Sequence, residues 1–283
     1  MSLQLPIVTI NGVHNSFVSP LDRGFAYGDG LFETCRYFAG RIPLWDFHRE
    51  RLLASAQRLR IALDEVRLNE YLDSLLALLR MNQIADAVVK VQLTRGVGGR
   101  GYRLPDIINP TYCIGVFAGE PLQSDFFRGG VDVRVCDLRL GKNSALAGIK
   151  HLNRLEHIMA RAEWHDEFAE GLLLDTDGNV TEATVSNFFL VKGGELITPD
   201  LDAAGVAGVM RRAIIDIFAA QLNLSVKVTR LKLSDLRAAD EIFLSNSVFG
   251  IWPVNSIAGM ELLLRHTVTR QLQEKLLAWL RNT

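Results

Sequence analysis

The sequence predicts a two-domain protein of the mixed α/β (α+β) class. A chain of 283 residues is long enough for about two ordinary domains. Short runs rich in β-branched residues alternate along it with amphipathic segments of helical period. A polar stretch containing glycine, proline and serine interrupts this pattern. We therefore expect a small, strand-rich N-terminal α/β domain over residues 1–118, a linker over 119–127 and a larger C-terminal α/β domain over 128–283.

The N-terminal domain is expected to contain several strands and two helices. Asn11-Gly12 lies between two apolar runs and predicts a hairpin, because a type I′ turn needs positive φ at both central residues. Asp46 is expected to cap a helix that ends near Arg60, with a second helix over residues 68–81. The other strands predicted here cover residues 33–38, 41–44, 88–94 and 111–117.

The C-terminal domain is predicted to begin with a strand over residues 131–138. An amphipathic helix should follow from about Lys150 to Phe168, with its apolar side chains on an inward face, namely Leu152, Leu155, Ile158 and Met159. Gly208 is expected to open a second helix that reaches about Leu222. The remaining predictions are strands over residues 171–174, 180–185, 187–191, 196–198, 226–231 and 241–244, and a C-terminal helix over 261–280.

Composition narrows the class of protein. Hydrophobic residues make up 48% of the chain and charged residues 22%, which is the balance of a globular protein with real cores. A formal net charge of −1 gives no electrostatic case for nucleic acid or an anionic membrane as a partner. No apolar run approaches the roughly 20 residues of a membrane span. The three cysteines have no metal-binding or redox spacing, so we expect a reducing, cytoplasmic location.

Four features together point to the cofactor pyridoxal 5′-phosphate, PLP. Lys150 is a candidate nucleophile that would hold the cofactor as a Schiff base. Glu182 follows a turn and could face the pyridine nitrogen, keeping it protonated. The helix that opens at Gly208 offers free N–H groups to a phosphate, and Arg51 and Ser247 would complete that cradle. Each residue taken alone has an ordinary alternative, as a surface or turn residue.

Two further segments are rich in glycine. Asp22 to Thr34 has three glycines within seven residues, interleaved with aromatic side chains, which suggests a tight loop where backbone approaches another group closely. Arg95 to Tyr102 combines four glycines with two arginines. Arginine suits planar anions, since its guanidinium pairs bidentately with a carboxylate or a phosphate.

With these residues in view, the chain resembles the class IV aminotransferase-like family, the fold-type IV group of PLP enzymes. The resemblance runs from about residue 8 to residue 255. The segments that carry it are Asp22-Arg23-Gly24 through Gly28-Asp29-Gly30, Glu50-Arg51-Leu52, Gly148-Ile149-Lys150, Val180-Thr181-Glu182 with Ser186-Asn187, and Gly205-Val206-Ala207-Gly208-Val209-Met210-Arg211. Within the family, the segments 94–102 and 147–156 look most like the branch that acts on aminodeoxychorismate as a lyase.

The resemblance implies a fold, a reaction and a set of site residues. The larger domain should form a pseudo-barrel, and the enzyme should be a homodimer with its active site between the domains. The implied reaction is elimination of pyruvate from aminodeoxychorismate to give p-aminobenzoate. Lys150 would be the Schiff-base lysine and base, and Glu182 the partner of the pyridine nitrogen. The implied phosphate contacts are Arg51, the backbone of Val209 and Met210, and Ser247, and the implied substrate contacts are Arg100, Tyr102 and Phe32.

Two departures separate the chain from related transaminases. Phe32 stands where D-amino-acid transaminases have a tyrosine, and Leu155 stands where branched-chain transaminases have one. An aminotransferase acting on D-amino acids or branched-chain amino acids remains the first alternative, since it needs the same Lys150 and Glu182. A PLP-binding protein without catalysis is the second.

No metal site is expected. His151, His157 and His165 lie on one predicted helix, but their spacings of six and eight residues do not match ligands three or four residues apart. We therefore interpret them as ordinary polar residues.

Overall fold

The structure, a computed structural model, describes residues 3–14 and 16–282. The chain divides into two compact units. The first holds the chain up to Glu120 together with Lys150–Asn153, and the second holds Pro121–Ile149 together with the chain from Arg154 onward. A short piece around Lys150 therefore belongs with the N-terminal part of the chain, although the segments on both sides of it belong with the C-terminal part.

The first unit is built on a five-stranded antiparallel sheet of order β2-β1-β5-β4-β3. Its strands are β1 (Ile7–Ile10), β2 (Val13–His14), β3 (Gly30–Phe38), β4 (Asp86–Thr94) and β5 (Thr111–Ala118). Asn11 and Gly12 have φ of 50° and 78°, which confirms the predicted hairpin turn. The strand predicted over residues 41–44 is wrong, because β3 pairs with β4 along its whole length and Arg41 makes only an isolated bridge to Phe38.

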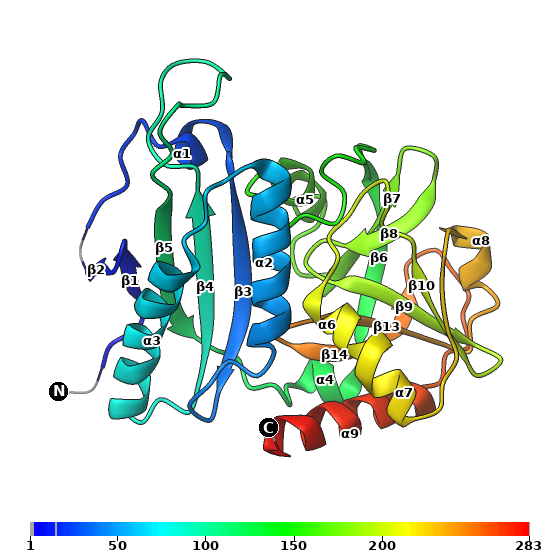
Figure 1. Cartoon of the computed structure of the whole chain (residues 1–283). Helices are drawn as coiled ribbons and strands as arrows, with labels where there is room; N and C mark the ends of the chain where they lie inside the picture. The colour runs from blue at the N-terminus through cyan, green and yellow to red at the C-terminus, as the bar shows by residue number, and fades with distance from the viewer. Residues whose placement is uncertain (1–2, 15, 283) are drawn as a thin grey trace. The chain divides into compact units, whose positions relative to one another are not determined.

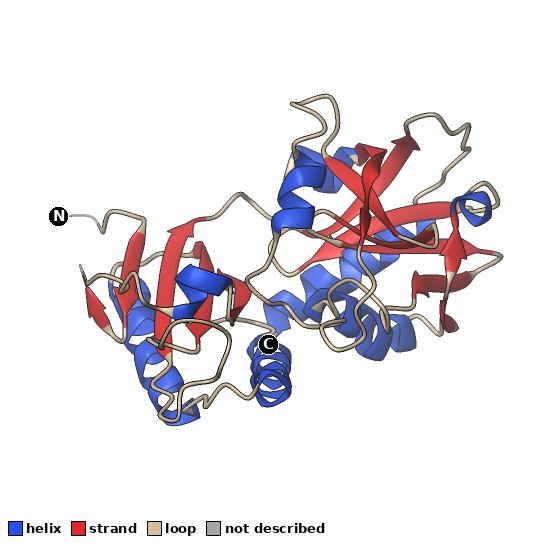
Figure 2. Cartoon of the chain, turned by 90° about the horizontal axis from the view of Figure 1, so that it is seen from above, coloured by secondary structure: helices blue, strands red, loops and turns tan. Residues whose placement is uncertain are grey.

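Two long helices, α2 (Trp45–Leu59) and α3 (Glu65–Met81), pack on one face of this sheet, as Figure 1 shows. Figure 2 shows the strands of the sheet side by side from above. The inward leucines of α3 are buried as its periodicity predicts. The predicted cap at Asp46 is wrong: Leu44 precedes the helix, and Asp46 lies in the first turn, where its charge still suits the helix dipole.

A short helix, α1 (Arg23–Tyr27), replaces part of the loop predicted over residues 22–34. The Asp22 carboxylate accepts a hydrogen bond from the Gly24 N–H, 2.8 Å away, and caps the helix. Gly28 ends the helix in the left-handed conformation. One turn of helix with a cap at each end is too short to leave a periodic signal in the sequence.

The second unit is built on a nine-stranded mixed sheet of order β11-β10-β9-β13-β14-β6-β7-β8-β12. Its strands are β6 (Val131–Leu140), β7 (Glu170–Asp175), β8 (Asn179–Ala183), β9 (Asn187–Lys192), β10 (Glu195–Pro199), β11 (Val226–Thr229), β12 (Leu231–Lys232), β13 (Glu241–Asn246) and β14 (Gly250–Ile257). The sequence prediction missed β14. Gly250 and Pro253 lie within it, and such residues argue against a central strand when only the sequence is read.

The helices of the second unit are α4 (Asp125–Gly129), α5 (Leu155–Arg161), α6 (Val209–Ala213), the π-helical η1 (Ile214–Phe218), α7 (Ala219–Gln221), α8 (Leu233–Leu236) and α9 (Thr267–Asn282). The run from α6 through α7 is continuous and matches the helix predicted after Gly208. Helix α4 begins inside the segment predicted as a linker and ends two residues beyond it. The C-terminal helix begins at Thr267, six residues later than predicted, where the Glu241 carboxylate accepts hydrogen bonds from the Val268 and Thr269 N–H groups, each at 2.8 Å.

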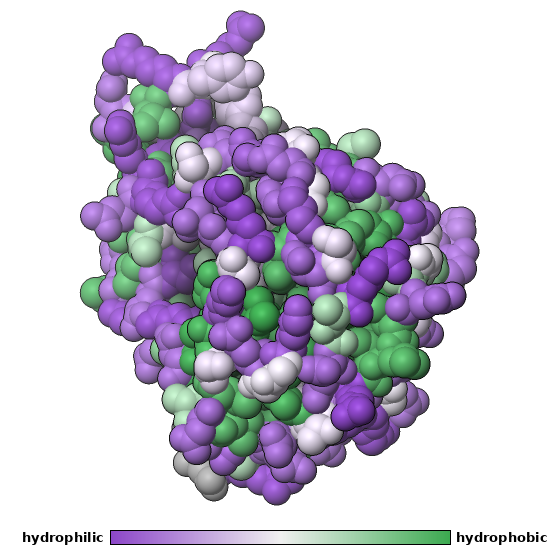
Figure 3. Space-filling model, turned by 90° about the vertical axis from the view of Figure 1, so that its right-hand side faces the viewer, coloured by the Kyte–Doolittle hydropathy of each residue, from purple (hydrophilic) through white to green (hydrophobic). Residues whose placement is uncertain are grey.

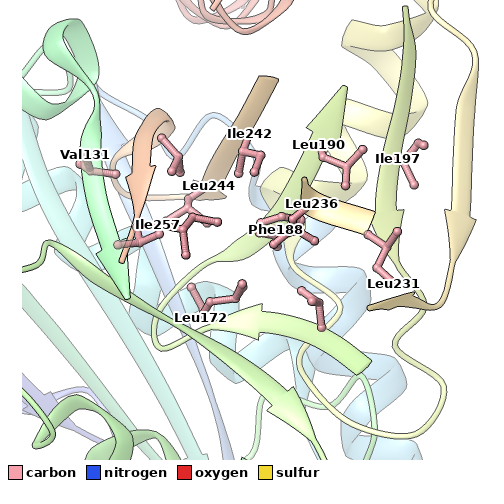
Figure 4. Close-up of a cluster of buried hydrophobic side chains, with 14 residues drawn as sticks. Val131, Leu172, Phe188, Leu190, Ile197, Leu231, Leu236, Ile242, Leu244 and Ile257 are labelled. Carbon is pink, nitrogen blue, oxygen red and sulfur yellow. The ribbon is translucent and has the colours of Figure 1, made fainter. Parts of the chain in front are cut away.

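The core of the second unit lies between its strands and α8. Figure 4 shows apolar side chains of β6, β7, β9, β10, β13 and β14 directed toward one another, with Leu236 of α8 among them. Phe188, Ile242 and Leu244 are each 1% exposed or less. Burial of a side chain of this size contributes about 1.5–3 kcal/mol, so this cluster is a main source of stability for the unit.

Among the helices of the described residues, none is long and apolar enough to cross a membrane. Two units of strands and helices confirm the predicted mixed α/β class.

Candidate active site

Lys150 lies on an extended segment and not at the start of a helix, so that prediction is wrong. The Phe32 N–H donates to the Lys150 carbonyl at 2.9 Å, and the Leu152 N–H donates to the Gly30 carbonyl at 3.0 Å. Residues 150–153 thus lie along the edge of β3. A Cβ on Gly30 would come within 2.7 Å of the Leu152 side chain, so a glycine is needed for this close approach.

Helix α5 begins only at Leu155 and ends at Arg161. The expectation that its apolar face points inward is also wrong, because Leu155, Ile158 and Met159 are 72%, 61% and 63% exposed. Because residues 150–153 pair with β3, they cannot form the first turns of the predicted helix. In the shorter helix that remains, the side that packs against the second unit is not the side that carries Leu155, Ile158 and Met159.

The Lys150 ammonium lies over an aromatic ring. Its Nζ is 4.3 Å from the centroid of Phe32, and the Nζ of Lys90 is 5.4 Å from the same centroid. Phe32 belongs to the half-buried face of β3, opposite the buried Leu31. Two lysine amines therefore face one ring, and the main-chain bond between Phe32 and Lys150 fixes the nearer one.

Arg51 belongs to a buried ionic cluster with Glu33 and His48. Arg51 Nε donates to Glu33 Oε1 at 2.9 Å, its Nη2 pairs with Glu33 Oε2, and His48 Nδ1 is 2.6 Å from that same oxygen. Glu33 is 1% exposed. Burial by itself would raise the pKa of Glu33, but the Arg51 charge and the hydrogen bond from His48 outweigh it and lower the pKa to about 2.

His48 is neutral in this cluster. Burial lowers the pKa of His48, and the positive charges of Arg51 and Lys150 act in the same direction, while Glu33 opposes them. A neutral imidazole next to a carboxylate donates its Nδ1–H. The cluster thus fixes the orientation of the Arg51 guanidinium.

Arg100 and Tyr102 lie on the exposed part of the loop between β4 and β5, where Tyr102 is 85% exposed. This loop is anchored at Gly101 and at its first residue, Arg95. The Arg23 Nη1 donates to the Gly101 carbonyl at 3.0 Å, and Arg23 and Arg95 share the carboxylate of Asp29, each through Nε at 2.8 Å. The two glycine-rich segments of the sequence are therefore joined by the Arg95–Asp29 ion pair and by the hydrogen bond from Arg23 to Gly101.

Glu182 lies on β8 and is 3% exposed. Its Oε1 is 2.9 Å from His157 Nε2, and its Oε2 accepts a hydrogen bond from the Val206 N–H at 2.9 Å. The loop that contains Val206 is held beside Gly148, since the Gly148 N–H donates to Gly205 at 2.9 Å. A buried carboxylate with one donor on each oxygen is fixed in position and remains able to accept a further hydrogen bond.

Val209 and Met210 open helix α6, and both are buried. Gly208 precedes them without a side-chain cap, and a Cβ at this position would come within 1.7 Å of Asn187 Oδ1. The first N–H groups of a helix have no partner within the helix. Ser247 follows β13, which packs against α6, in a turn fixed by hydrogen bonds from Val248 and Phe249 to Asn246 Oδ1.

Glu33, His48 and His157 were not selected from the sequence, because each is far along the chain from its partner. One signal was available for Glu33. It alternates with Leu31 and Cys35 on the buried face of β3, and a carboxylate at such a position needs a cation beside it. Among the described residues, no group of three or more His, Cys, Asp or Glu side chains is arranged to hold a metal ion.

This chain belongs to the amino-transferase class IV family, whose model matches residues 30–257. The resemblance identified from the sequence is thereby confirmed.

Two of the proteins that the chain resembles over nearly its whole length are named aminodeoxychorismate lyases. The chain is 35% identical over 271 residues to the aminodeoxychorismate lyase of Vibrio harveyi, covering 94% of this chain and 98% of the relative. Its structure is similar to the crystal structure of 4-amino-4-deoxychorismate lyase from Pseudomonas aeruginosa, with a TM-score of 0.87. The two sequences are 39% identical, and the match covers 95% of this chain and 97% of that one. The D-alanine aminotransferase of Listeria monocytogenes is 32% identical over 260 residues, which cover 89% of this chain and 87% of the relative. The fold-type IV architecture predicted from the sequence is confirmed.

Proposed function

We propose that the protein is a PLP-dependent 4-amino-4-deoxychorismate lyase, which eliminates pyruvate to give p-aminobenzoate for folate synthesis. The observation that carries the proposal is the Phe32 ring, whose centroid is 4.3 Å from Lys150 Nζ. The residue at which the chain departs from the tyrosine of D-amino-acid transaminases therefore lies directly beside the proposed catalytic lysine. Near full-length similarity to two lyases supports the same conclusion.

The donor groups of the chain fit PLP. Lys150 supplies the amine that links the cofactor covalently, and the buried Glu182 carboxylate suits a protonated ring nitrogen. The uncapped helix start at Val209 and Met210 suits a phosphate. We assign Arg51 and Ser247 to the same phosphate; the Glu33 pair orients Arg51 in advance.

When bound, PLP would hold the substrate through its amino nitrogen and accept the electrons released at the adjacent ring carbon. With PLP bound, Lys150 Nζ would be the group that takes the proton from C4 of the substrate. Glu182 would face the ring nitrogen of the cofactor and hold a proton there. Loss of the enolpyruvyl ether from C3 releases pyruvate and leaves an aromatic ring, so the protein mainly has to position the leaving group.

Arg100 is assigned to a substrate carboxylate, with Tyr102 and Phe32 beside the substrate ring. The exposure of Arg100 and Tyr102 supports this role, because a small-molecule substrate has to reach them from solvent. The hydrogen bonds that hold the loop at Gly101, between these two residues, support it too, since binding a carboxylate requires a positioned side chain.

A homodimer in the cytoplasm is part of the proposal. Three exposed apolar side chains within the short helix α5 support a partner surface, as do the exposed Phe17 and Phe25 of the first unit. Figure 3 shows apolar surface between the polar residues on one face of the molecule. Three cysteines without a disulfide support a reducing compartment.

The test supplies enzymatically generated aminodeoxychorismate and follows p-aminobenzoate and pyruvate in the same sample. Equimolar appearance of both products is expected from the wild type and essentially none from Lys150→Ala. A wild-type rate in Lys150→Ala would remove the lysine from the mechanism.

An aminotransferase is the second candidate, favoured by the similarity to a D-alanine aminotransferase. Alanine or glutamate as amino donor distinguishes the two. Rapid conversion of the bound cofactor to its amine form, without p-aminobenzoate from aminodeoxychorismate, would favour the aminotransferase. A protein that binds PLP and does neither would be the non-catalytic alternative.

A further inference from the structure

We infer that His157 is a positioning residue for Glu182, donating its Nε2–H so that this carboxylate keeps a proton on the ring nitrogen of the cofactor. The inference rests on the proposed function, because it concerns Glu182 as the partner of bound PLP. His157 and Glu182 both lie within the second unit.

Each carboxylate oxygen of Glu182 has a hydrogen-bond donor from the protein. His157 Nε2 is 2.9 Å from Oε1, and the Val206 N–H is 2.9 Å from Oε2. The side chains of His157 and Glu182 are 13% and 4% exposed, so water does not readily replace either contact. The Arg154 guanidinium is also close enough for the Glu182 charge to act on it. Both contacts suit a carboxylate that accepts a hydrogen bond on each oxygen.

The two nitrogens of His157 are not equivalent. Nδ1 is buried and has no hydrogen-bond partner within the described part of the chain. An ionised carboxylate only accepts, so Nε2 must carry a proton to bond with Glu182. A second proton, on Nδ1, would be buried without an acceptor. The structure therefore assigns the neutral tautomer with the proton on Nε2.

This tautomer has a consequence for the proton between Glu182 and the cofactor. A carboxylate that already accepts two hydrogen bonds is a weaker base than one that accepts a single bond. The proton shared with the ring nitrogen therefore stays on the nitrogen. Without the His157 N–H, Oε1 would lose this hydrogen bond and the Glu182 carboxylate could rotate.

Three variants separate positioning from simple packing. In His157→Gln the amide nitrogen reaches about the position of Nε2 and retains a donor. In His157→Asn, the matched control, a similar amide reaches only the position of Nδ1. In His157→Leu the volume is retained and the donor is lost.

Two measurements apply to these proteins. The ¹⁵N spectrum of His157 in the full-length protein without cofactor reports its tautomer. The ¹⁵N shift of ring-labelled PLP in the holoenzyme reports protonation of the ring nitrogen. Wild type and His157→Gln should show a protonated ring nitrogen, and in His157→Leu and His157→Asn the ¹⁵N shift should move toward the unprotonated value. In His157→Leu and His157→Asn, kcat/KM should fall about tenfold to a hundredfold, the range for losing a hydrogen bond to a charged group.

A proton on Nδ1 of His157 in the protein without cofactor would overturn the inference. So would an unchanged ring-nitrogen shift and rate in His157→Asn, even if His157→Leu fails to fold. If the wild type does not bind PLP at all, the proposed function fails, and the tautomer measurement still decides the geometry of the pair.

Discussion

Glu33→Gln should lower the free energy of unfolding of the first unit far more than the same substitution in an exposed ion pair. The substitution leaves Arg51, which is 12% exposed, without its counter-charge and with only a neutral amide as partner. The pKa of Glu33 falls from an ordinary 4.5 to about 2, a difference that corresponds to about 3 kcal/mol of stability at neutral pH. Removing one member of a buried ion pair typically costs about 3–5 kcal/mol. The two values agree.

The pH dependence of this difference has a definite sign. A carboxylate whose folded pKa is lowered contributes fully above its unfolded pKa and loses the contribution as the pH falls toward the folded value. The gap between wild type and Glu33→Gln should be constant from neutral pH down to about pH 5.5 and narrow to about 2 kcal/mol near pH 3.5.

The assay is urea unfolding followed by far-UV circular dichroism, without PLP and at one protein concentration, because ligand and subunit binding both shift apparent stability. Glu65→Gln is the matched control. Its partner Arg49 is also an arginine, but the pair is about one-third exposed, so the cost should stay below about 1 kcal/mol. A Glu33→Gln variant within about 0.5 kcal/mol of wild type at neutral pH would refute the reasoning.

Two other predictions concern the backbone and the thiols. Gly96→Ala should lower stability by about 2 kcal/mol or more, because φ is +86° and a Cβ would come within 1.8 Å of the Asn109 carbonyl oxygen; Gly99→Ala, with open space around it, should change a thermal melt little. Burial raises the pKa of Cys35, Cys113 and Cys136, the last to about 12, so a disulfide reagent near pH 8 should modify at most the half-buried Cys113 before unfolding and all three thiols afterwards. Rapid native reaction of Cys35 or Cys136, or equal melts for the two glycine variants, would contradict these predictions.

Local signals in the sequence predicted the local structure well. The Asn11-Gly12 turn and helix α3 depend on residues adjacent in the chain, and both were predicted. The segment after Lys150 was mistaken for a helix because its structure depends on a distant partner, the edge of β3. An apolar spacing of three and four residues does not reveal that competition.

The same distinction applies to the candidate site. Lys150 and Glu182 were selected because their flanking residues resemble a known family. The resemblance also implies Phe32 as a substrate contact, but it does not predict that Phe32 lies beside Lys150, which it precedes by more than a hundred residues. His157, which precedes Glu182 by 25 residues, is not predicted as its partner. A sequence shows which residue types could carry the chemistry, whereas the neighbours that hold those side chains in place depend on the completed fold.

The most direct test of this account is to locate the lysine that holds the cofactor. Borohydride reduction of the PLP-loaded protein, followed by peptide mass spectrometry, identifies it. Lys150 and Lys90 face the same Phe32 ring at 4.3 and 5.4 Å, so the structure itself supplies the competitor. We expect a single modified peptide that contains Lys150. Modification of Lys90 in its place, or of no lysine, would contradict the account.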